Sequence, residues 1–237
     1  MLPEHLPLEV RTALERLRDA AETTDAVSAL VLYGDAVRSH RSGREVNVAV
    51  ILGDADPAVL DALAGPLQRA WRAARVEAFL LTTAEVARLA DVFPVRVLDL
   101  KTHGITLYGD NPFQAVAVDP EHLRLRVEQE LRNHLMRLRR RYVAANGDPA
   151  TLQAMLDRSA GWLPAPLGAL LRLVGDEQPD PPLAAAVARF TLDDDVARRL
   201  VDVHAGKADD DPAALTRGVL ALLARVVQVA DELEVQS

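Results

Sequence analysis

The sequence has no cysteine and, among its 237 residues, only two lysines, Lys101 and Lys207. The absence of cysteine excludes disulfide bonds, cysteine-rich zinc sites and thiol nucleophiles. Because lysine is so scarce, arginine carries nearly all of the positive charge, a bias typical of a GC-rich genome as much as of any function. Aromatic residues make up only 4% of the chain, and we interpret Trp71 and Trp162 as packing residues rather than platforms for base stacking.

Targeting and membrane signals are also missing from the sequence. Residues 1–5 lack the basic region and apolar core of a signal peptide, and no stretch approaches a membrane-spanning length. We therefore expect a cytoplasmic protein with no membrane partner. The formal net charge of -8 makes duplex DNA an unfavourable partner, because affinity for DNA comes mainly from basic side chains that neutralise phosphates. A length of 237 residues fits one large or two modest domains, and an apolar content of 49% is sufficient for buried cores.

A glycine turn between two apolar runs is the most informative pattern in the chain. The first run, residues 29–33, stops at Gly34. The second run, residues 45–52, begins with polar residues at alternate positions, Glu45 and Asn47. Side chains two apart in a strand project from the same face, so the pattern predicts that these two lie together beside the glycine turn.

This layout resembles the nucleotidyltransferase superfamily, which includes polymerase beta, kanamycin nucleotidyltransferase and the minimal nucleotidyltransferases. In that superfamily a Gly-Ser turn that opens a helix holds the nucleotide phosphates, and an Asp-x-Asp pair on the next strand binds divalent metal. Gly34 matches the glycine, Asp35 takes the serine position, Arg38 matches a frequent companion, and Glu45 and Asn47 fall on the two aspartates. The resemblance implies a nucleoside triphosphate ligand, nucleotide-binding roles for the first three residues and catalytic roles for the last two.

Two of these positions depart from the family pattern. Asp35 would repel phosphate where a serine would donate a hydrogen bond, and Asn47 offers a neutral amide in place of a carboxylate. A two-metal magnesium site usually takes carboxylates from at least two protein residues. Glu45 is therefore the one residue we predict as a metal ligand, and we expect Mg²⁺ binding to be weak. The alternative is that Glu45 and Asn47 are solvent-facing residues of an edge strand.

Further along the chain, residues 76–81 predict a third strand, and Thr82 and Glu85 have the spacing of a helix-opening capping box. A fourth strand is predicted within residues 91–101. This segment resembles uncharacterised bacterial two-domain members of the same superfamily, in which an acidic residue often occupies the position of Arg96.

This chain has an arginine, Arg96, where the similar proteins often have an acidic residue, and this difference suggests a role for Arg96. It could neutralise Glu45 much as a metal would, and we assign it to the nucleotide-binding set. Asp99 and Glu77 are the alternative carboxylates, and we place Asp99 in the catalytic set. On a strand, Arg96 and Asp99 would point to opposite faces, so only one of them could serve the site. The alternative for Asp99 is a strand-end residue that pairs with Lys101.

The second half of the chain carries helical patterns only. The arginines between residues 124 and 141 could bind phosphate or RNA, but we favour a solvated helix face. A separate amphipathic helix is expected at residues 6–22, with core positions at Leu8, Val10, Leu14 and Leu17. In the second half, helices are expected near residues 120–145, 149–174, 181–189, 193–204 and 212–234, with short breaks that suit an antiparallel bundle.

The sequence therefore predicts an α+β protein with two domains. Residues 1–118 would form a nucleotidyltransferase-like mixed sheet with helices, and residues 119–237 an all-α bundle.

The function we favour is a nucleotidyltransferase-fold pseudoenzyme, weakly active or inactive, that binds a nucleotide or small phosphate ligand. The alternatives are an active Mg²⁺-dependent nucleotidyltransferase acting on a small molecule or protein, and an antitoxin-like or structural protein with a protein partner or a second copy of itself. Ribonuclease activity is not predicted, because Arg132 and His134 lie closer together than the arginine and histidine of related helical ribonuclease domains.

Overall fold

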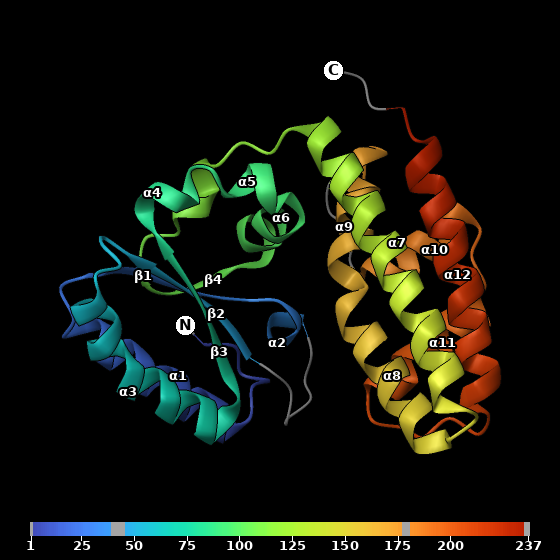
Figure 1. Ribbon diagram of the computed structural model, residues 1–237, viewed down its shortest axis with the longest axis horizontal. Helices are drawn as coiled ribbons and strands as arrows, with labels where there is room; N and C mark the ends of the chain where they lie inside the picture. Colours follow the sequence, from blue (N-terminus) through green and yellow to red (C-terminus); the bar gives the residue numbers. More distant parts are fainter. Residues whose placement is uncertain (1, 39–45, 177–180, 235–237) are drawn as a thin grey trace. The chain divides into compact units, whose positions relative to one another are not determined.

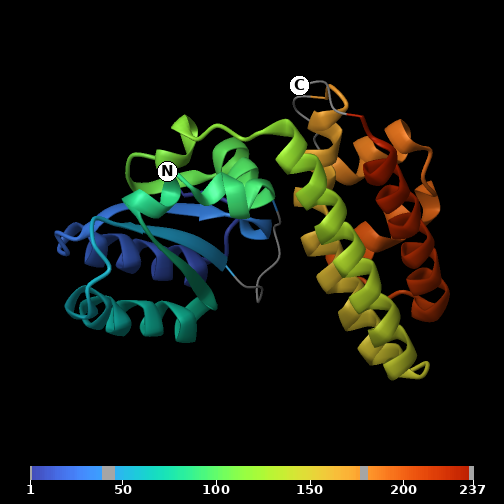
Figure 2. The same cartoon turned by 45° about the horizontal axis from the view of Figure 1, so that its top comes forward.

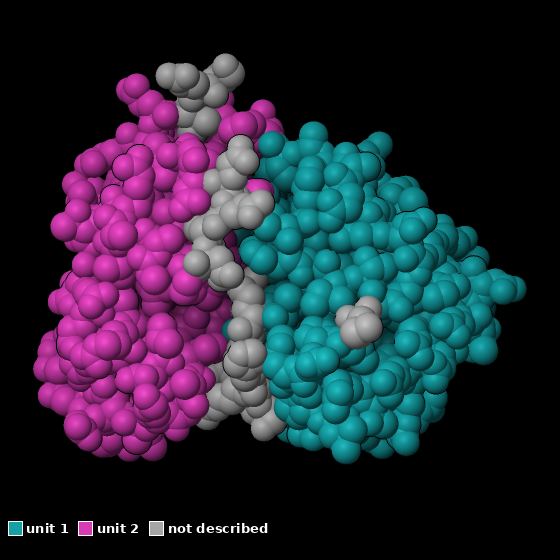
Figure 3. Space-filling model, turned by 180° about the vertical axis from the view of Figure 1, so that it is seen from behind, with its two compact units in different colours: residues 1–118 teal, residues 119–237 magenta. Residues whose placement is uncertain are grey.

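The computed structural model describes residues 2–38, 46–176 and 181–234. The chain divides into two units, Met1–Val118 (unit 1) and Asp119–Ser237 (unit 2), which Figure 3 distinguishes by colour. Unit 1 contains a sheet with helices, whereas the described residues of unit 2 form helices without a strand.

A four-stranded mixed sheet forms the centre of unit 1 (Figure 1). Its strands lie in the order β3-β2-β1-β4, and their bounds are β1 Val27–Tyr33, β2 Val46–Leu52, β3 Val76–Thr82 and β4 Ile105–Gly109. β1 is antiparallel to β2 and β4, whereas β2 and β3 are parallel. The apolar sequences of β1 and β2 suit central strands that are covered on both faces.

Helices cover both faces of this sheet (Figure 2). On one face, α1 (Leu8–Glu22) and α3 (Pro57–Ala74) pack over a core that includes Leu32 and Val48. On the opposite face, the core includes Val31, Ile51 and Val97. This second face carries the short elements α4 (Thr83–Val86), α5 (Leu89–Val92), α6 (Pro94–His103) and the 3-10 helix η1 (Pro112–Ala115).

The predicted N-terminal helix is confirmed as α1, with one error in its core. Val10, Leu14 and Leu17 are buried, but Leu8, which was expected beside them, is 69% exposed because the helix begins at this residue. The predicted capping box is confirmed. Thr82 N donates to Glu85 Oε2 at 2.7 Å, and Glu85 N donates to Thr82 Oγ1 at 3.3 Å.

The fourth strand predicted within residues 91–101 is wrong. Those residues belong mainly to α5 and α6, and the fourth strand is β4 at Ile105–Gly109. Pro94 lies at the start of α6, where the missing N–H costs no helical hydrogen bond. Val97 and Leu100, three residues apart, are fully buried. A short apolar run of this kind fits both the strand and the helix period, so the sequence pattern could not separate the two.

The helices of unit 2 are α7 (Pro120–Ala145), α8 (Pro149–Trp162), α9 (Pro164–Leu173), α10 (Pro182–Phe190), α11 (Asp194–His204) and α12 (Pro212–Glu232). The single helix predicted over residues 149–174 is two helices, which meet at Leu163. Pro164 has no N–H and cannot donate the next backbone hydrogen bond of α8, so that helix ends and α9 begins. Aspartate side chains accept backbone hydrogen bonds at the starts of α7, α8, α11 and α12.

α12 corrects the expectation that no stretch approaches a membrane-spanning length. By length and composition alone, this helix could cross a bilayer. Leu215, Val219, Leu223 and Val226 are nevertheless fully buried, on the side of α12 that packs with α7 and α8. This one-sided burial is typical of a core helix in a bundle.

Candidate functional site

β1 ends at a tight turn that lies against β2. Gly34 has a φ of +80°, in the left-handed region that favours glycine, and a Cβ added there would lie 3.4 Å from Asn47 Nδ2. The short helix α2 (Asp35–Arg38) follows at once, and Val37 N donates to Gly34 O at 3.2 Å. Gly34 and Asn47 therefore lie side by side.

Three polar side chains form a row across β1, β2 and the edge strand β3, which we call the polar row: Tyr33, Asn47 and Glu77. Tyr33 is the Cα partner of Asn47 between β1 and β2, and Asn47 is the partner of Glu77 between β2 and β3. Residues paired in this way project from the same face of a sheet. Tyr33 belongs to the core under α6, so the polar row lies on that face. Glu77 is exposed and Asn47 is half-buried.

Asp99 has a different environment from the one predicted. It lies on α6, is 7% exposed, and its Oδ1 atom is 3.2 Å from Nδ1 of His103, one helical turn further on. The strand argument that separated Arg96 from Asp99 does not apply to a helix. Lys101, the alternative partner of Asp99, instead donates to Val116 O at 3.0 Å. Glu77 rather than Asp99 is therefore the carboxylate in register with Asn47.

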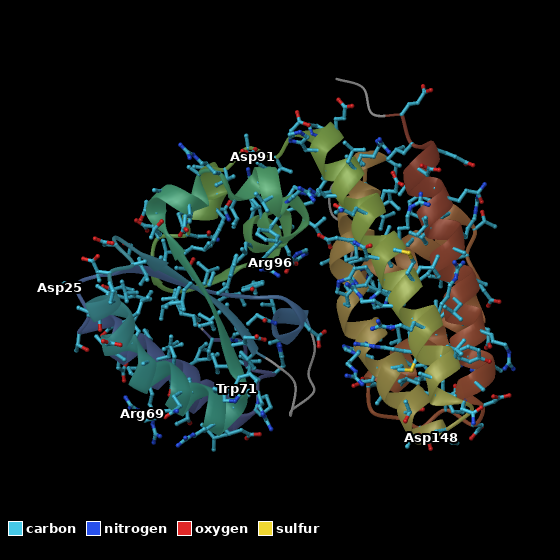
Figure 4. The ribbon with its side chains drawn as sticks, viewed as in Figure 1. Asp25, Arg69, Trp71, Asp91, Arg96 and Asp148 are labelled. Carbon is cyan, nitrogen blue, oxygen red and sulfur yellow. The ribbon has the colours of Figure 1, made fainter. Side chains whose placement is uncertain are left out.

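Arg96 stacks on two phenylalanine rings. Its guanidinium carbon lies 4.6 Å from the ring centre of Phe79 and 5.3 Å from that of Phe93, and the two rings meet edge to face at 87°. Figure 4 shows Arg96 on α6. Phe79 follows Glu77 by two residues on β3, so both project from the same face. The guanidinium therefore lies over the face that carries the polar row.

Tyr33 connects Arg96 electrostatically to the polar row. Burial raises the pKa of the Tyr33 hydroxyl, Arg96 lowers it, and Asp99 and Glu77 raise it further. The hydroxyl is therefore protonated at neutral pH and can donate a hydrogen bond. These opposing effects show that three charged groups lie around the end of β1.

The structure does not test the roles predicted for Glu45, Asp35 and Arg38. Glu45, the predicted metal ligand, lies outside the described residues, so its role and its pairing with Arg96 stay predictions. Asp35 and Arg38 are the first and last residues of α2, directly after the glycine turn. Their nucleotide-binding roles also stay predictions.

The described residues do not by themselves fit a two-metal site. No group of three or more His, Asp or Glu side chains that could hold a metal ion occurs within residues 2–38, 46–176 and 181–234. Beside Gly34 the polar row offers the neutral amide of Asn47 and one carboxylate, that of Glu77. Two-metal catalysis normally uses more anionic oxygens than this.

Several α7 arginines contact protein groups within unit 2. Arg124 donates to Ala230 O at 3.2 Å, and Arg132 donates to Glu128 Oε1 at 2.6 Å. Both interactions lie within the helical unit, and they agree with the interpretation of this segment as a helix face.

Neither a family model nor a curated protein matches the chain. Among solved structures, the chain is similar to spectinomycin adenyltransferase AAD(9) from Enterococcus faecialis, whose structure contains ATP and spectinomycin. The TM-score is 0.58 at 8% sequence identity, and the match covers 91% of this chain and 98% of the other. At this identity the likeness shows the fold. The chain therefore has a nucleotidyltransferase-like α+β fold followed by a helical region, as the sequence predicted.

Proposed function

We propose that this protein binds a nucleotide or another phosphate ligand beside the Gly34 turn, and that its nucleotidyl-transfer activity is weak or absent. The observation that carries the proposal is the polar row Tyr33–Asn47–Glu77, which lies next to a left-handed glycine at the end of β1. The AAD(9) structure contains ATP, so a nucleoside triphosphate is the first ligand to test.

The expected weakness of catalysis follows from charge. Metal ions that bridge a triphosphate need anionic protein oxygens, and Asn47 supplies a neutral oxygen at the centre of the row. Asp35 begins α2 and brings a carboxylate to the end of the helix where a phosphate would lie. The amide removes an anionic metal ligand and the Asp35 carboxylate repels phosphate, so both changes weaken transfer chemistry.

The position of Glu77 supports a second candidate function, an active Mg²⁺-dependent nucleotidyltransferase that acts on a small molecule. Glu77 is exposed and in register with Asn47, so a ligand could reach its carboxylate. Together with Glu45 it would supply two carboxylates to the site.

Thermal unfolding with ATP, GTP, CTP and UTP, each with and without Mg²⁺ or Mn²⁺, tests both candidates. A ligand that binds only the folded state raises the midpoint, and at a concentration of 100 times Kd it stabilises by about 2.7 kcal/mol. We expect a rise with at least one nucleotide. Glu9→Gln is a matched control, because Glu9 is exposed on α1, which packs on the opposite face of the sheet.

The pattern of shifts separates the two candidates. A shift that depends on metal and disappears in Glu77→Gln, together with pyrophosphate release in the presence of an acceptor, would favour the active enzyme. A shift without turnover would favour the binding protein. The absence of any shift with all four nucleotides, with and without metal, would refute both.

A further inference from the structure

Arg96 is oriented before any ligand arrives. The distances of 4.6 Å to the Phe79 ring and 5.3 Å to the Phe93 ring are within the range of cation–π interactions. Stacking of a planar guanidinium on an aromatic ring restricts its rotation. Less side-chain entropy is then lost when the guanidinium binds a ligand.

The N–H groups of Arg96 are available at the edge of this stack. Across the described part of the chain, no group accepts a hydrogen bond from Arg96 and no carboxylate pairs with it, and the residue is exposed. Arg199 in unit 2 provides the contrast, because its Nε and Nη2 atoms donate to Asp209 at 2.9 and 2.6 Å. The Arg96 donors have the fork geometry that matches two oxygens of a phosphate.

Asn47 adds a second donor on the same face. Its Nδ2 atom lies on the side of Gly34, as shown by the 3.4 Å distance to a Cβ built on that glycine. A side-chain amide can donate hydrogen bonds directly to phosphate oxygens. An aspartate at this position would repel them unless a cation lay between. Phe79 and Glu77, two residues apart on β3, place Arg96 over the face from which Asn47 projects.

We propose that Arg96, together with Asn47, binds the ligand's phosphate groups directly, with no divalent cation between protein and ligand. The ligand class is a nucleoside diphosphate or triphosphate, or inorganic pyrophosphate, which carries the same oxyanions. This inference rests on the proposed function and adds to it the residues that neutralise the ligand's charge.

Isothermal titration calorimetry of the full chain in EDTA tests the inference with ATP, ADP, pyrophosphate and adenosine. We expect ATP and pyrophosphate to bind in EDTA, with Mg²⁺ changing Kd by less than threefold and NaCl weakening the binding. Adenosine, which has no phosphate, distinguishes a nucleotide ligand from inorganic pyrophosphate. If ATP binds at least tenfold more tightly than pyrophosphate, and adenosine also binds, the nucleoside part contributes. Equal binding of ATP and pyrophosphate assigns recognition to the phosphates alone.

Substitutions then assign the binding to Arg96. Arg96→Gln should weaken ATP binding in EDTA at least tenfold. Arg96→Lys should weaken it three- to tenfold, because an ammonium group keeps the positive charge but cannot donate two parallel hydrogen bonds to a phosphate. Arg88→Gln is the control for net charge, since Arg88 is also exposed in unit 1 and precedes α5. Phe79→Leu keeps Arg96 but removes the ring on which its guanidinium stacks, so it should weaken ATP binding several-fold. This variant tests the inference even if the Arg96 variants fold poorly.

Each failure has its own signature. ATP binding that requires Mg²⁺ and is unchanged in Arg96→Gln and Phe79→Leu would overturn the role of Arg96 and leave the proposed function intact. Absence of ATP and pyrophosphate binding in both EDTA and Mg²⁺ would overturn the proposed function itself. Equal loss of ATP binding in Arg88→Gln and Arg96→Gln would also overturn the inference, because net charge alone would then explain it.

Discussion

Asn47 of β2 and Glu77 of β3 are Cα partners in parallel neighbouring strands, so a neutral amide and a carboxylate lie side by side on one face of the sheet. A second carboxylate at position 47 would place two negative charges in adjacent strands. Without a cation between them, like charges at paired positions destabilise a sheet. The identity of residue 47 therefore decides whether this part of the sheet favours a metal ion or can exist without one.

Asn47→Asp should make nucleotide binding depend on metal. In EDTA we expect the free energy of unfolding to fall by about 0.5 kcal/mol, because the new carboxylate faces Glu77. Mg²⁺ should reverse this loss, and ATP should then bind at least tenfold more tightly with Mg²⁺ than without it. Urea unfolding and calorimetry measure the two effects. Asn47→Ser is the neutral control, and equal metal dependence in both variants would contradict the prediction.

Gly34→Ala should lower the free energy of unfolding by about 1 kcal/mol through backbone strain, because the residue has a φ of +80°. The added Cβ would meet Asn47 Nδ2 at 3.4 Å, an ordinary contact, so sterics should add little. The same substitution in an Asn47→Ala background should therefore cost about the same. Gly147→Ala, at φ +82° with nothing within 4 Å, is the control for strain alone. A cost that disappears in the Asn47→Ala background would show that packing dominates.

Asp99→Asn should change the stability of the protein, whereas Glu77→Gln should change its nucleotide binding. Asp99 is buried and lies 3.2 Å from His103, so its neutralisation should lower the free energy of unfolding by about 1–2 kcal/mol and leave the Kd for ATP within twofold. Glu77 is exposed, so Glu77→Gln should leave stability nearly unchanged and change the Kd for ATP measured in EDTA. Chemical unfolding and calorimetry on both variants provide the test. A large loss of affinity in Asp99→Asn alone would restore Asp99 to the binding site.

The stability of unit 2 should fall in mild acid because of His134. Its ring stacks on Trp162 at 4.1 Å and 6°, and its Nε2 atom lies 3.1 Å from Ser159 Oγ. Burial, with Arg137 and Arg141 nearby, lowers the pKa of His134 from 6.5 to about 4. The unfolded chain therefore binds a proton between these values that the folded chain excludes. The free energy of unfolding is therefore unaffected by His134 well above pH 6.5, and it falls as the pH decreases from 6.5 towards 4.

The expected loss between pH 7 and pH 5 is about 2 kcal/mol. Thermal unfolding across this range measures it, and His134→Gln is the control, since glutamine cannot titrate and can still donate to Ser159. A wild-type profile no steeper than that of His134→Gln would contradict the assignment.

Local sequence signals predicted many elements of this fold correctly. The capping box at Thr82 and Glu85, the start of α7 after Asp119 and the end of that helix at Asn146 depend on neighbouring residues, and the structure confirms them. The long helices whose apolar residues recur over several turns, α1, α7 and α12, lie close to their predicted residue ranges. The errors occur where a short apolar segment fits two periods, as in residues 91–101, and where a predicted helix runs across a proline that begins a new helix, as at Pro164.

The composition of the candidate site could be predicted only in part. The adjacency of Gly34 and Asn47 follows from a strand, a turn and a returning strand. The choice between Glu77 and Asp99 does not, because it depends on how β3 aligns with β2 and on the helical state of residues 94–103. The position of Arg96 on Phe79 and Phe93 joins α6 to β3 and has no local signal.

The sequence by itself determined the fold class, the glycine turn and the neutral amide at position 47, because these follow from residue chemistry and from periodic patterns along continuous segments. Only the tertiary structure decided which carboxylate stands beside that amide and which face of the sheet Arg96 covers. Strand register and helix placement depend on packing between segments far apart in the chain, and an alternation of apolar residues does not specify that packing.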